Sequence, residues 1–390
     1  MMRPWRRADL SKVWTWPHIF WFNIFAWWAE DIQNKTLQRI AIKFRLFLLI
    51  FNVWFLFSLM TNNFVEISNN GLTNSLFTIF ASLPAVLAFT KLAYLIKYRR
   101  ELRKAIDDLD DLLLETINKG VDPVLEVKLR KHYARCWLLF YFLLIVGSMI
   151  TLHWLMRPIM LALGGIKTSI VVTYPNMIET WTQVFVTYVI HAINVATDGH
   201  ALYMFDNFYF CMAENILIQF TILRHNLHNM NITTGKPGNI TIKTCAEHHN
   251  KILRICETLR VSSVSAILFQ CFHTVLLLCS GVFELTLGKK NLQVFMNLAE
   301  ITLIIVFILY CYCWYSNEIT FQCRDLLHSL YMTDWLNGTV EDRRIVVTMM
   351  SMTMHPVVFG GIVKINLNTF LDVLKTTFSY YNFLTAVDLQ

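Results

Sequence analysis

Residues 372–390, DVLKTTFSYYNFLTAVDLQ, form the closing stretch of the chain and give the first indication of its fold. The part from Val373 to Val387 is long and apolar enough to sit in a bilayer, yet it carries a lysine, three threonines, a serine and an asparagine. Polar side chains in a membrane segment face other helices or water, because exposing them to lipid is costly. This stretch therefore predicts a membrane helix with one side turned toward protein or water.

The composition of the whole chain is typical of a membrane protein. Of its 390 residues, 55% are hydrophobic and only 16% are charged, whereas soluble domains contain about 25% charged residues. Aromatic residues are abundant, with 29 Phe, 14 Tyr and 12 Trp. We therefore predict an all-α, polytopic protein that lies in a lipid bilayer.

Seven stretches have the length and hydropathy of membrane-spanning helices. They are Leu46–Met60, Leu76–Ile96, Cys136–Met156, Val184–Met204, Val261–Phe283, Val294–Tyr315 and Leu367–Val387. The first is the shortest, although residues 37–44 can extend it. The fourth is the weakest, because it contains two histidines, an asparagine and an aspartate.

The positions of lysine and arginine predict the orientation of these spans. Of the 34 basic residues, 27 fall in the N-terminal segment and the connections 97–135, 224–260 and 324–344, and only four fall in the opposite connections. Per residue of connection, the first group of segments still holds about twice as many lysines and arginines as the opposite connections. Lysine and arginine are enriched on the cytoplasmic side of membrane proteins. With seven spans, the N-terminus is then cytoplasmic and the C-terminus extracellular.

The chain is expected to divide into four parts. Residues 1–45 form a cytoplasmic segment whose Trp-rich run, Ile19 to Ala29, is predicted to lie in the bilayer interface. A signal anchor is the alternative, although no small-residue cleavage site follows this run. Residues 46–335 contain six spans with a ligand pocket. Residues 336–361 contain an anchor helix and the break after it at Gly360-Gly361, and residues 362–390 form the final, pore-lining helix.

The cytoplasmic connections predict helices that continue beyond the membrane. Residues 101–117, ELRKAIDDLDDLLLETI, repeat apolar side chains at helical spacing. Similar patterns follow the fourth span, precede the fifth and follow the sixth. We expect a cytoplasmic anchor bundle that also contacts other subunits; amphipathic helices lying on the membrane surface are the alternative.

The sequence gives no support for an enzyme or for a metal or nucleotide site. It lacks the Rossmann, Walker, nucleophile-elbow and zincin motifs. The nine cysteines fall in spans or cytoplasmic connections, so no disulfide framework is implied. No cofactor, metal or nucleic acid is expected. A G-protein-coupled receptor remains an alternative, but the predicted orientation is the reverse, and Asp-Arg-Tyr after span three and Asn-Pro-x-x-Tyr in span seven are absent.

Several short motifs occur in a fixed order between residues 311 and 387. They are a Cys-Tyr-Cys run (Cys311 to Cys313) followed by Asn317-Glu318, Tyr331 to Trp335 as Tyr-x-x-x-Trp, Asp342 to Arg344 as Asp-Arg-Arg, Pro356, Gly360-Gly361 and a closing Leu-Lys-Thr-x-x-Ser-Tyr. As an ordered set these motifs resemble the insect odorant receptor family. The pair Tyr381-Asn382 departs from many members and leaves the lining of the pore open.

The resemblance implies a function as well as a fold. It implies a ligand-tuning subunit in the plasma membrane of an olfactory sensory neuron, assembled with the odorant co-receptor (Orco) into a heterotetramer. That assembly is a ligand-gated, non-selective cation channel for olfaction, opened by a small volatile compound. The long connection of the co-receptor and the closing Thr-Tyr…Gln-Phe of gustatory receptors are both absent here. A self-sufficient, homomeric channel of the gustatory type is the alternative.

The resemblance also suggests a pocket in the outer halves of spans two to six. Aromatic and weakly polar side chains there suit a small, neutral, largely apolar volatile; ordinary helix packing is the alternative for each. The predicted ligand-binding residues are Phe80, Leu83, Leu87, Gly147, Ile150, Trp154, Thr187, His191, Asn194, His273, Phe307 and Tyr310.

The final helix is expected to line the pore of the tetramer. Thr376, Ser379, Phe383 and Val387 fall near one stripe at 3.6 residues per turn. An apolar ring at Phe383 and Val387 could close by dewetting, and Asp388 could attract cations to the outer mouth. Alternatively, the polar residues pack against the protein's own helices and Asp388 marks the membrane surface.

Overall fold

The computed structural model describes residues 32, 34–175, 178–230, 240–286, 292–360 and 364–387, and the N-terminal run predicted to be interfacial lies outside these ranges. Within them the chain forms helices joined by loops, with one isolated β-bridge between Gly360 and Lys364. The elements are α3 (Lys35–Lys97), α4 (Arg99–Lys119), α5 (Pro123–Leu163), α6 (Trp181–Asn229), α7 (Ile242–Thr286), α8 (Leu292–Tyr331), the 3-10 turn η2 (Trp335–Asn337), α9 (Val340–Met354) and α10 (Leu367–Val387). The predicted all-α class is confirmed.

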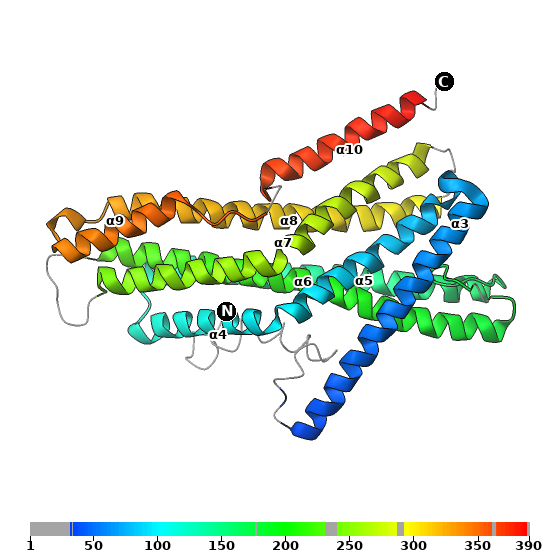
Figure 1. The fold of residues 1–390 in the computed structure, drawn as a ribbon, viewed down its shortest axis with the longest axis horizontal. Helices are drawn as coiled ribbons and strands as arrows, with labels where there is room; N and C mark the ends of the chain where they lie inside the picture. The colour runs from blue at the N-terminus through cyan, green and yellow to red at the C-terminus, as the bar shows by residue number, and fades with distance from the viewer. Residues whose placement is uncertain are drawn as a thin grey trace.

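Each of the seven predicted spans lies on one of these helices. Spans one and two share α3, which turns back on itself at Gly71 (Figure 1). The backbone of Gly71 has φ 76° and ψ 165°, a conformation that glycine adopts far more readily than other residues. By length and composition, four helices of the described chain could cross a membrane, namely Lys35–Asn69, Pro123–Leu163, Ile242–Cys279 and Ala299–Tyr331.

Several helices are much longer than a bilayer is thick. The 41 residues of α5 and the 49 of α6 correspond to about 62 and 74 Å at 1.5 Å per residue, whereas the hydrocarbon core is ~30 Å thick. The far ends of α6, α7 and α8 pack with α4 and α9 at one end of the molecule (Figure 1). We call this end the anchor bundle. It confirms the predicted helical extensions, and Leu102, Ile106, Leu109 and Leu113 of α4 are buried in it.

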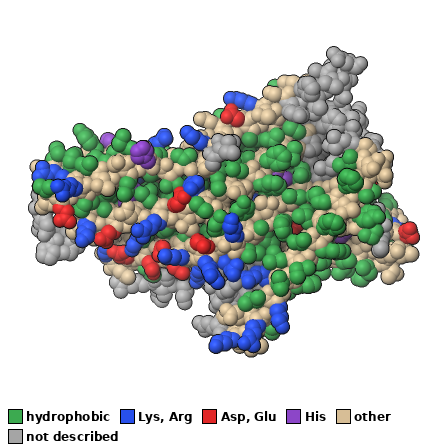
Figure 2. Space-filling view, viewed as in Figure 1, with side chains coloured by type: hydrophobic (Ala, Val, Ile, Leu, Met, Phe, Trp, Pro, Cys, Tyr) green, Lys and Arg blue, Asp and Glu red, His purple; other side chains and the backbone are tan. Residues whose placement is uncertain are grey.

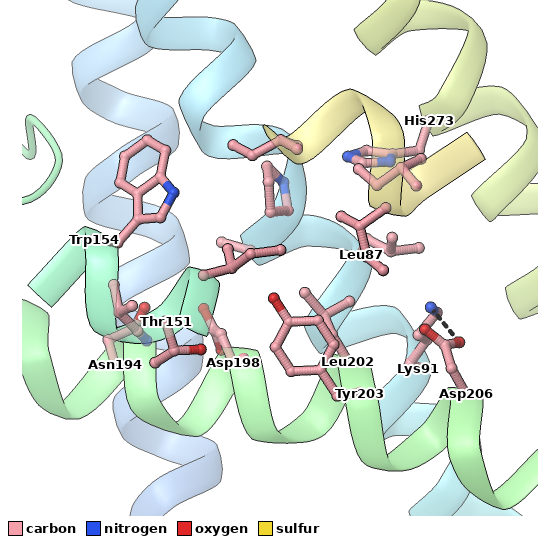
Figure 3. Close-up of a pocket in the computed structure, with 18 of the residues that line it drawn as sticks. Leu87, Lys91, Thr151, Trp154, Asn194, Asp198, Leu202, Tyr203, Asp206 and His273 are labelled. Atoms are coloured by element: carbon pink, nitrogen blue, oxygen red, sulfur yellow. Dashed lines mark hydrogen bonds and ion pairs between the residues drawn. The ribbon is translucent and has the colours of Figure 1, made fainter. Parts of the chain in front are cut away.

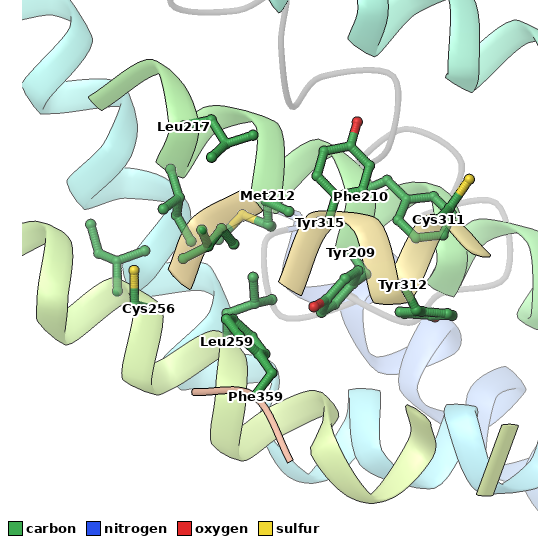
Figure 4. Packing of buried hydrophobic residues seen from close by; sticks show 14 of the residues in the cluster. Tyr209, Phe210, Met212, Leu217, Cys256, Leu259, Cys311, Tyr312, Tyr315 and Phe359 are labelled. Carbon is green, nitrogen blue, oxygen red and sulfur yellow. The ribbon is translucent and has the colours of Figure 1, made fainter. Parts of the chain in front are cut away.

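The core runs along α6. Every residue from 204 to 223 is buried, because α4, α5, α7 and α8 surround this part of the helix. An aromatic cluster lies where the spanning helices enter the anchor bundle (Figure 4), and in it the ring of Tyr312 on α8 lies 4.7 Å from Tyr209 and 5.0 Å from Phe210 of α6. The Tyr209 and Ser316 hydroxyls lie 3.2 Å apart. These contacts join α6 firmly to α8.

The surface is divided between charged and apolar regions. Charged side chains gather over the anchor bundle, whereas hydrophobic side chains cover much of the other half (Figure 2). Phe57, Phe64, Leu138 and Leu163 are each more than 70% exposed in this apolar half. Such a large apolar surface suits lipid, in agreement with a protein that crosses the membrane several times.

Candidate functional site

A cavity of about 140 Å³ lies among the spanning parts of α3, α5, α6, α7 and α8 (Figure 3). Most of its lining is apolar, including Phe55 and Leu59 of α3 and Ile301, Ile304 and Ile308 of α8. A small number of polar groups face the same space, from Thr151, Asn194, Asp198, Gln270, His273 and the pair Lys91–Asp206. An apolar enclosure with a few polar groups is the usual form of a small-molecule site.

The charged end of the cavity is an ion pair between two helices. Lys91 Nζ of α3 lies 2.6 Å from Asp206 Oδ1 of α6, and both side chains are 1% exposed. The hydroxyl of Tyr312 on α8 also donates a hydrogen bond to Asp206 Oδ1. The rings of Phe205 and Tyr312 lie 5.9 and 5.8 Å from the ammonium. The ammonium of Lys91 therefore already has protein partners for its positive charge.

Other polar side chains of the lining have no protein partner. Both side-chain polar atoms of Gln270 and both ring nitrogens of His273 are buried without a hydrogen bond in the described chain. Asp198 also has neither a hydrogen bond nor an ion pair among the described residues. Asn194 differs, because its amide donates to Asn52 Oδ1 at 2.9 Å. The cavity thus holds donors and acceptors that a bound molecule could use.

Five of the twelve predicted ligand residues line this cavity. They are Leu87, Ile150, Trp154, Asn194 and His273, which come from α3, α5, α6 and α7. The structure brings them together from spans two to five. Figure 3 shows Trp154 and Leu87 bordering the same space toward which Asp198 and Tyr203 rise from α6.

Six other predicted ligand residues lie outside the lining. His191 stands behind the cavity residue Phe55, with the two ring centres 5.3 Å apart, and its Nε2 lies 3.2 Å from the hydroxyl of Thr173. Phe307 packs on Phe142 and Tyr310 on Phe370. The remaining three are Leu83, Thr187 and Gly147.

The position of Gly147 still affects the cavity through a neighbour. A Cβ atom built on Gly147 would lie 2.5 Å from Cδ2 of Tyr203, a residue of the lining. The bare glycine therefore lets the Tyr203 ring pack against α5. The side chain of the twelfth predicted residue, Phe80, lies outside the described residues.

The final helix α10 has one face buried and another exposed. Val373 and Thr377 pack inward, where α10 contacts α7 and α8, while Thr376 and Ser379 are exposed in the single chain. Their hydroxyls donate to the carbonyls of Asp372 and Lys375, at 2.7 and 3.0 Å. The side chains of Phe383 and Val387, and all of Asp388, lie outside the described residues.

Sequence reasoning missed the ion pair and the unpartnered Asp198. Lys91 and Asp206 are 115 residues apart, and nothing in the sequence says that they meet. A signal was nevertheless present, because ionisable residues inside or beside membrane spans are costly and commonly functional. Lys91 in span two and Asp198 in span four both satisfied that rule.

Known relatives by sequence are odorant receptors of insects. Odorant receptor 46a, isoform B, of Drosophila melanogaster is 21% identical over 54% of this chain and 58% of its own length. Isoform A is matched over 42% of its length, so the chain spans about half the length of these two curated relatives. Odorant receptor Or2 of Anopheles gambiae is 20% identical over 69% of this chain and 73% of its own.

A solved structure has the same fold. The insect olfactory receptor OR5 from Machilis hrabei, in complex with eugenol, superposes with a TM-score of 0.82 over 98% of this chain and 99% of its own, at 14% identity. The seven-helix membrane architecture predicted from the sequence is therefore confirmed. The family described as 7tm Odorant receptor matches residues 71–378, which is most of the chain. The protein is thus a member of the 7tm odorant receptor family, as its closing motifs suggested.

Proposed function

We propose that the protein is the ligand-tuning subunit of a heteromeric, odorant-gated cation channel in the plasma membrane. A small volatile compound binds in the cavity between α3, α5, α6, α7 and α8, and its binding opens a pore lined by α10. The N-terminus is cytoplasmic and the C-terminus extracellular. The observation that carries the proposal is the largely apolar cavity between the helices of an odorant receptor fold.

The size and chemistry of the cavity support a volatile ligand. Its volume of about 140 Å³ is close to that of an engineered apolar cavity of ~150 Å³ that binds benzene. Small organic compounds are held in such sites by shape, with a few polar groups that set orientation. The complex of OR5 with eugenol shows that a protein of this fold binds a compound of this class.

The exposed face of α10 supports a role in a pore. Asp372, Thr376 and Ser379 recur at helical spacing and are all exposed in the single chain. A charged side chain facing lipid is costly, so this face suits water or a neighbouring subunit. In a tetramer, Phe383 and Val387 would then form an apolar ring that closes by dewetting, and Asp388 would attract cations at the outer mouth.

Recording from excised patches tests the proposal and its alternatives. The protein is expressed with and without the co-receptor, and a panel of volatiles is applied in nucleotide-free solution. We expect unitary cation currents that require both subunits and a ligand. Robust ligand-evoked current from this chain alone would instead support a homomeric, gustatory-type channel, and a requirement for GTP would support a G-protein-coupled receptor.

A further inference from the structure

The lining of the cavity contains two aspartates, one lysine and one histidine. Lys91 is the lysine of the lining, and Asp198 and Asp206 are its two carboxyl groups; the lining has no arginine or glutamate among the described residues. Lys91 and Asp206 neutralise each other through the contact of 2.6 Å. Asp198 is left over, and the described lining has no second lysine or arginine to balance it.

Asp198 is directed into the cavity and has no protein partner. Figure 3 shows its side chain rising from α6 between Thr151 and Tyr203. It forms no hydrogen bond or ion pair with any described residue. A carboxylate in apolar surroundings without a donor is unfavourable, so a ligand that supplies donors and positive charge would gain from binding there.

Two other residues independently indicate a polar ligand. Gln270 and His273 line the same cavity from α7, and each is 1% exposed. All four of their side-chain nitrogen and oxygen atoms are buried without a hydrogen bond. Buried polar groups are normally paired, and a purely hydrocarbon ligand would leave these atoms unsatisfied.

Aromatic faces complete the environment of a cation. Trp154 of α5 and Tyr203 of α6 both line the cavity, and positive charge is attracted to the faces of such rings. An anionic ligand is disfavoured, because Lys91 is already held by Asp206 and by the rings of Phe205 and Tyr312.

We propose that the preferred ligands are small primary amines, bound as ammonium ions to the carboxylate of Asp198. The hydrocarbon part lies among the apolar residues, beside Trp154 and Ile150. This inference rests on the proposed function, because it names the chemical class that the same cavity recognises. It replaces the neutral ligand expected from sequence with a charged one.

Three compounds of matched size test the inference. Benzylamine, benzyl alcohol and benzoate are applied to cells that express the protein with the co-receptor. We expect benzylamine to be the strongest agonist and benzoate to be inactive. Asp198→Asn should raise the half-maximal concentration of benzylamine about tenfold or more, since a charge-assisted hydrogen bond contributes this much. The response to benzyl alcohol should change much less.

Glu300→Gln is the matched control. Glu300 is an acidic residue of α8 that pairs with His153 and does not line the cavity. This variant should respond to all three compounds as the wild type does. The inference is overturned if Asp198→Asn responds to benzylamine like the wild type, or if benzoate is the strongest agonist.

A binding measurement separates this inference from the proposed function. If neutral volatiles open the channel but amines do not, the inference fails and the proposed function stands. If no compound gates current, the proposed function fails, and thermal stabilisation of the purified, full-length protein decides the inference. Benzylamine should then stabilise the wild type and not Asp198→Asn, and equal stabilisation of both would overturn the inference.

Discussion

Lys91 Nζ of α3 lies 2.6 Å from Asp206 Oδ1 of α6, and the pair is buried among spanning helices. Tyr312 of α8 bonds to the same carboxylate oxygen, so three helices meet at one charged centre. A lone charge in this environment would be very unfavourable. The pair therefore fixes how α3 and α6 are rotated toward each other, and with them the walls of the cavity.

Removing one member of the pair should destabilise the protein more than removing both. Lys91→Met leaves the Asp206 carboxylate buried without its positive partner, which lowers the free energy of unfolding by about 3–5 kcal/mol. Lys91→Met combined with Asp206→Asn leaves no buried charge and should recover much of the thermal stability and surface expression. Asp107→Asn, which breaks the exposed pair Arg103–Asp107 of α4, is the control and should have little effect. A double variant less stable than Lys91→Met would contradict this view of the pair.

Gly147→Ala should disturb the cavity although Gly147 does not line it. The new methyl group would lie 2.5 to 2.8 Å from three ring atoms of Tyr203, and such overpacking costs about 1–3 kcal/mol. The displaced ring should narrow the cavity and weaken the response to larger ligands. In a Tyr203→Ala background the same change should cost little, because the clash is gone. Ser148→Ala, at the exposed neighbouring position, is the control, and an equal loss of stability in both backgrounds would contradict the mechanism.

Much of the fold could be predicted, because membrane helices are long apolar stretches and their extensions keep a helical repeat. The polar fourth span looked weakest in sequence, and the structure explains its polarity. Asn194 bonds to Asn52, His191 packs on Phe55 and Asp198 faces the cavity. These polar side chains of α6 point into the protein, so the helix tolerates them within the membrane.

The lining of the cavity was harder to predict than the helices themselves. Phe307 and Tyr310 are apolar or aromatic like true lining residues, but they pack on Phe142 and Phe370 instead. Residue type does not fix the rotation of a membrane helix, because lipid, core and pocket all accept apolar side chains. The rotation follows from distant contacts such as Lys91–Asp206, which a single sequence does not reveal.

The anchor bundle should lose stability as the pH falls below neutrality. His249 is fully buried, and burial lowers its pKa from 6.5 to about 4. The unfolded chain therefore binds a proton at higher pH than the folded protein does, so stability is complete above pH 6.5 and declines as the pH falls toward 4. At pH 5 the loss is on the order of 2 kcal/mol.

His249→Phe should flatten this dependence, as measured by the melting temperature between pH 7.5 and 5. Part of the slope should remain, because burial also lowers the pKa of His248 to about 4. His355→Phe changes an exposed histidine beside α9 and should leave the dependence as in the wild type. An unchanged slope in His249→Phe would show that His249 is not protonated on unfolding.

Neighbouring threonines of α10 should differ in their access to water. Thr376 is exposed, whereas Thr377 is 8% exposed on the packed face. If α10 lines the pore, a membrane-impermeant thiol reagent should modify Thr376→Cys in open channels much faster than Thr377→Cys. Equal, slow modification of both cysteines in closed and open channels would exclude this face from the pore.

Phe383→Ala should raise the current that flows without ligand, because alanine side chains leave a wider constriction that dewets less readily.

The most direct test of the central claim, that a volatile bound in the cavity opens the channel, compares two aromatic residues. Trp154 lines the cavity, whereas Phe307 packs on Phe142 outside it. The measurement is the concentration of ligand that gives half-maximal current in excised patches with the co-receptor, at matched surface expression. We predict that Trp154→Ala changes this concentration about tenfold or more and alters the order of preferred ligands, while Phe307→Ala keeps both. Wild-type values for Trp154→Ala would contradict the account.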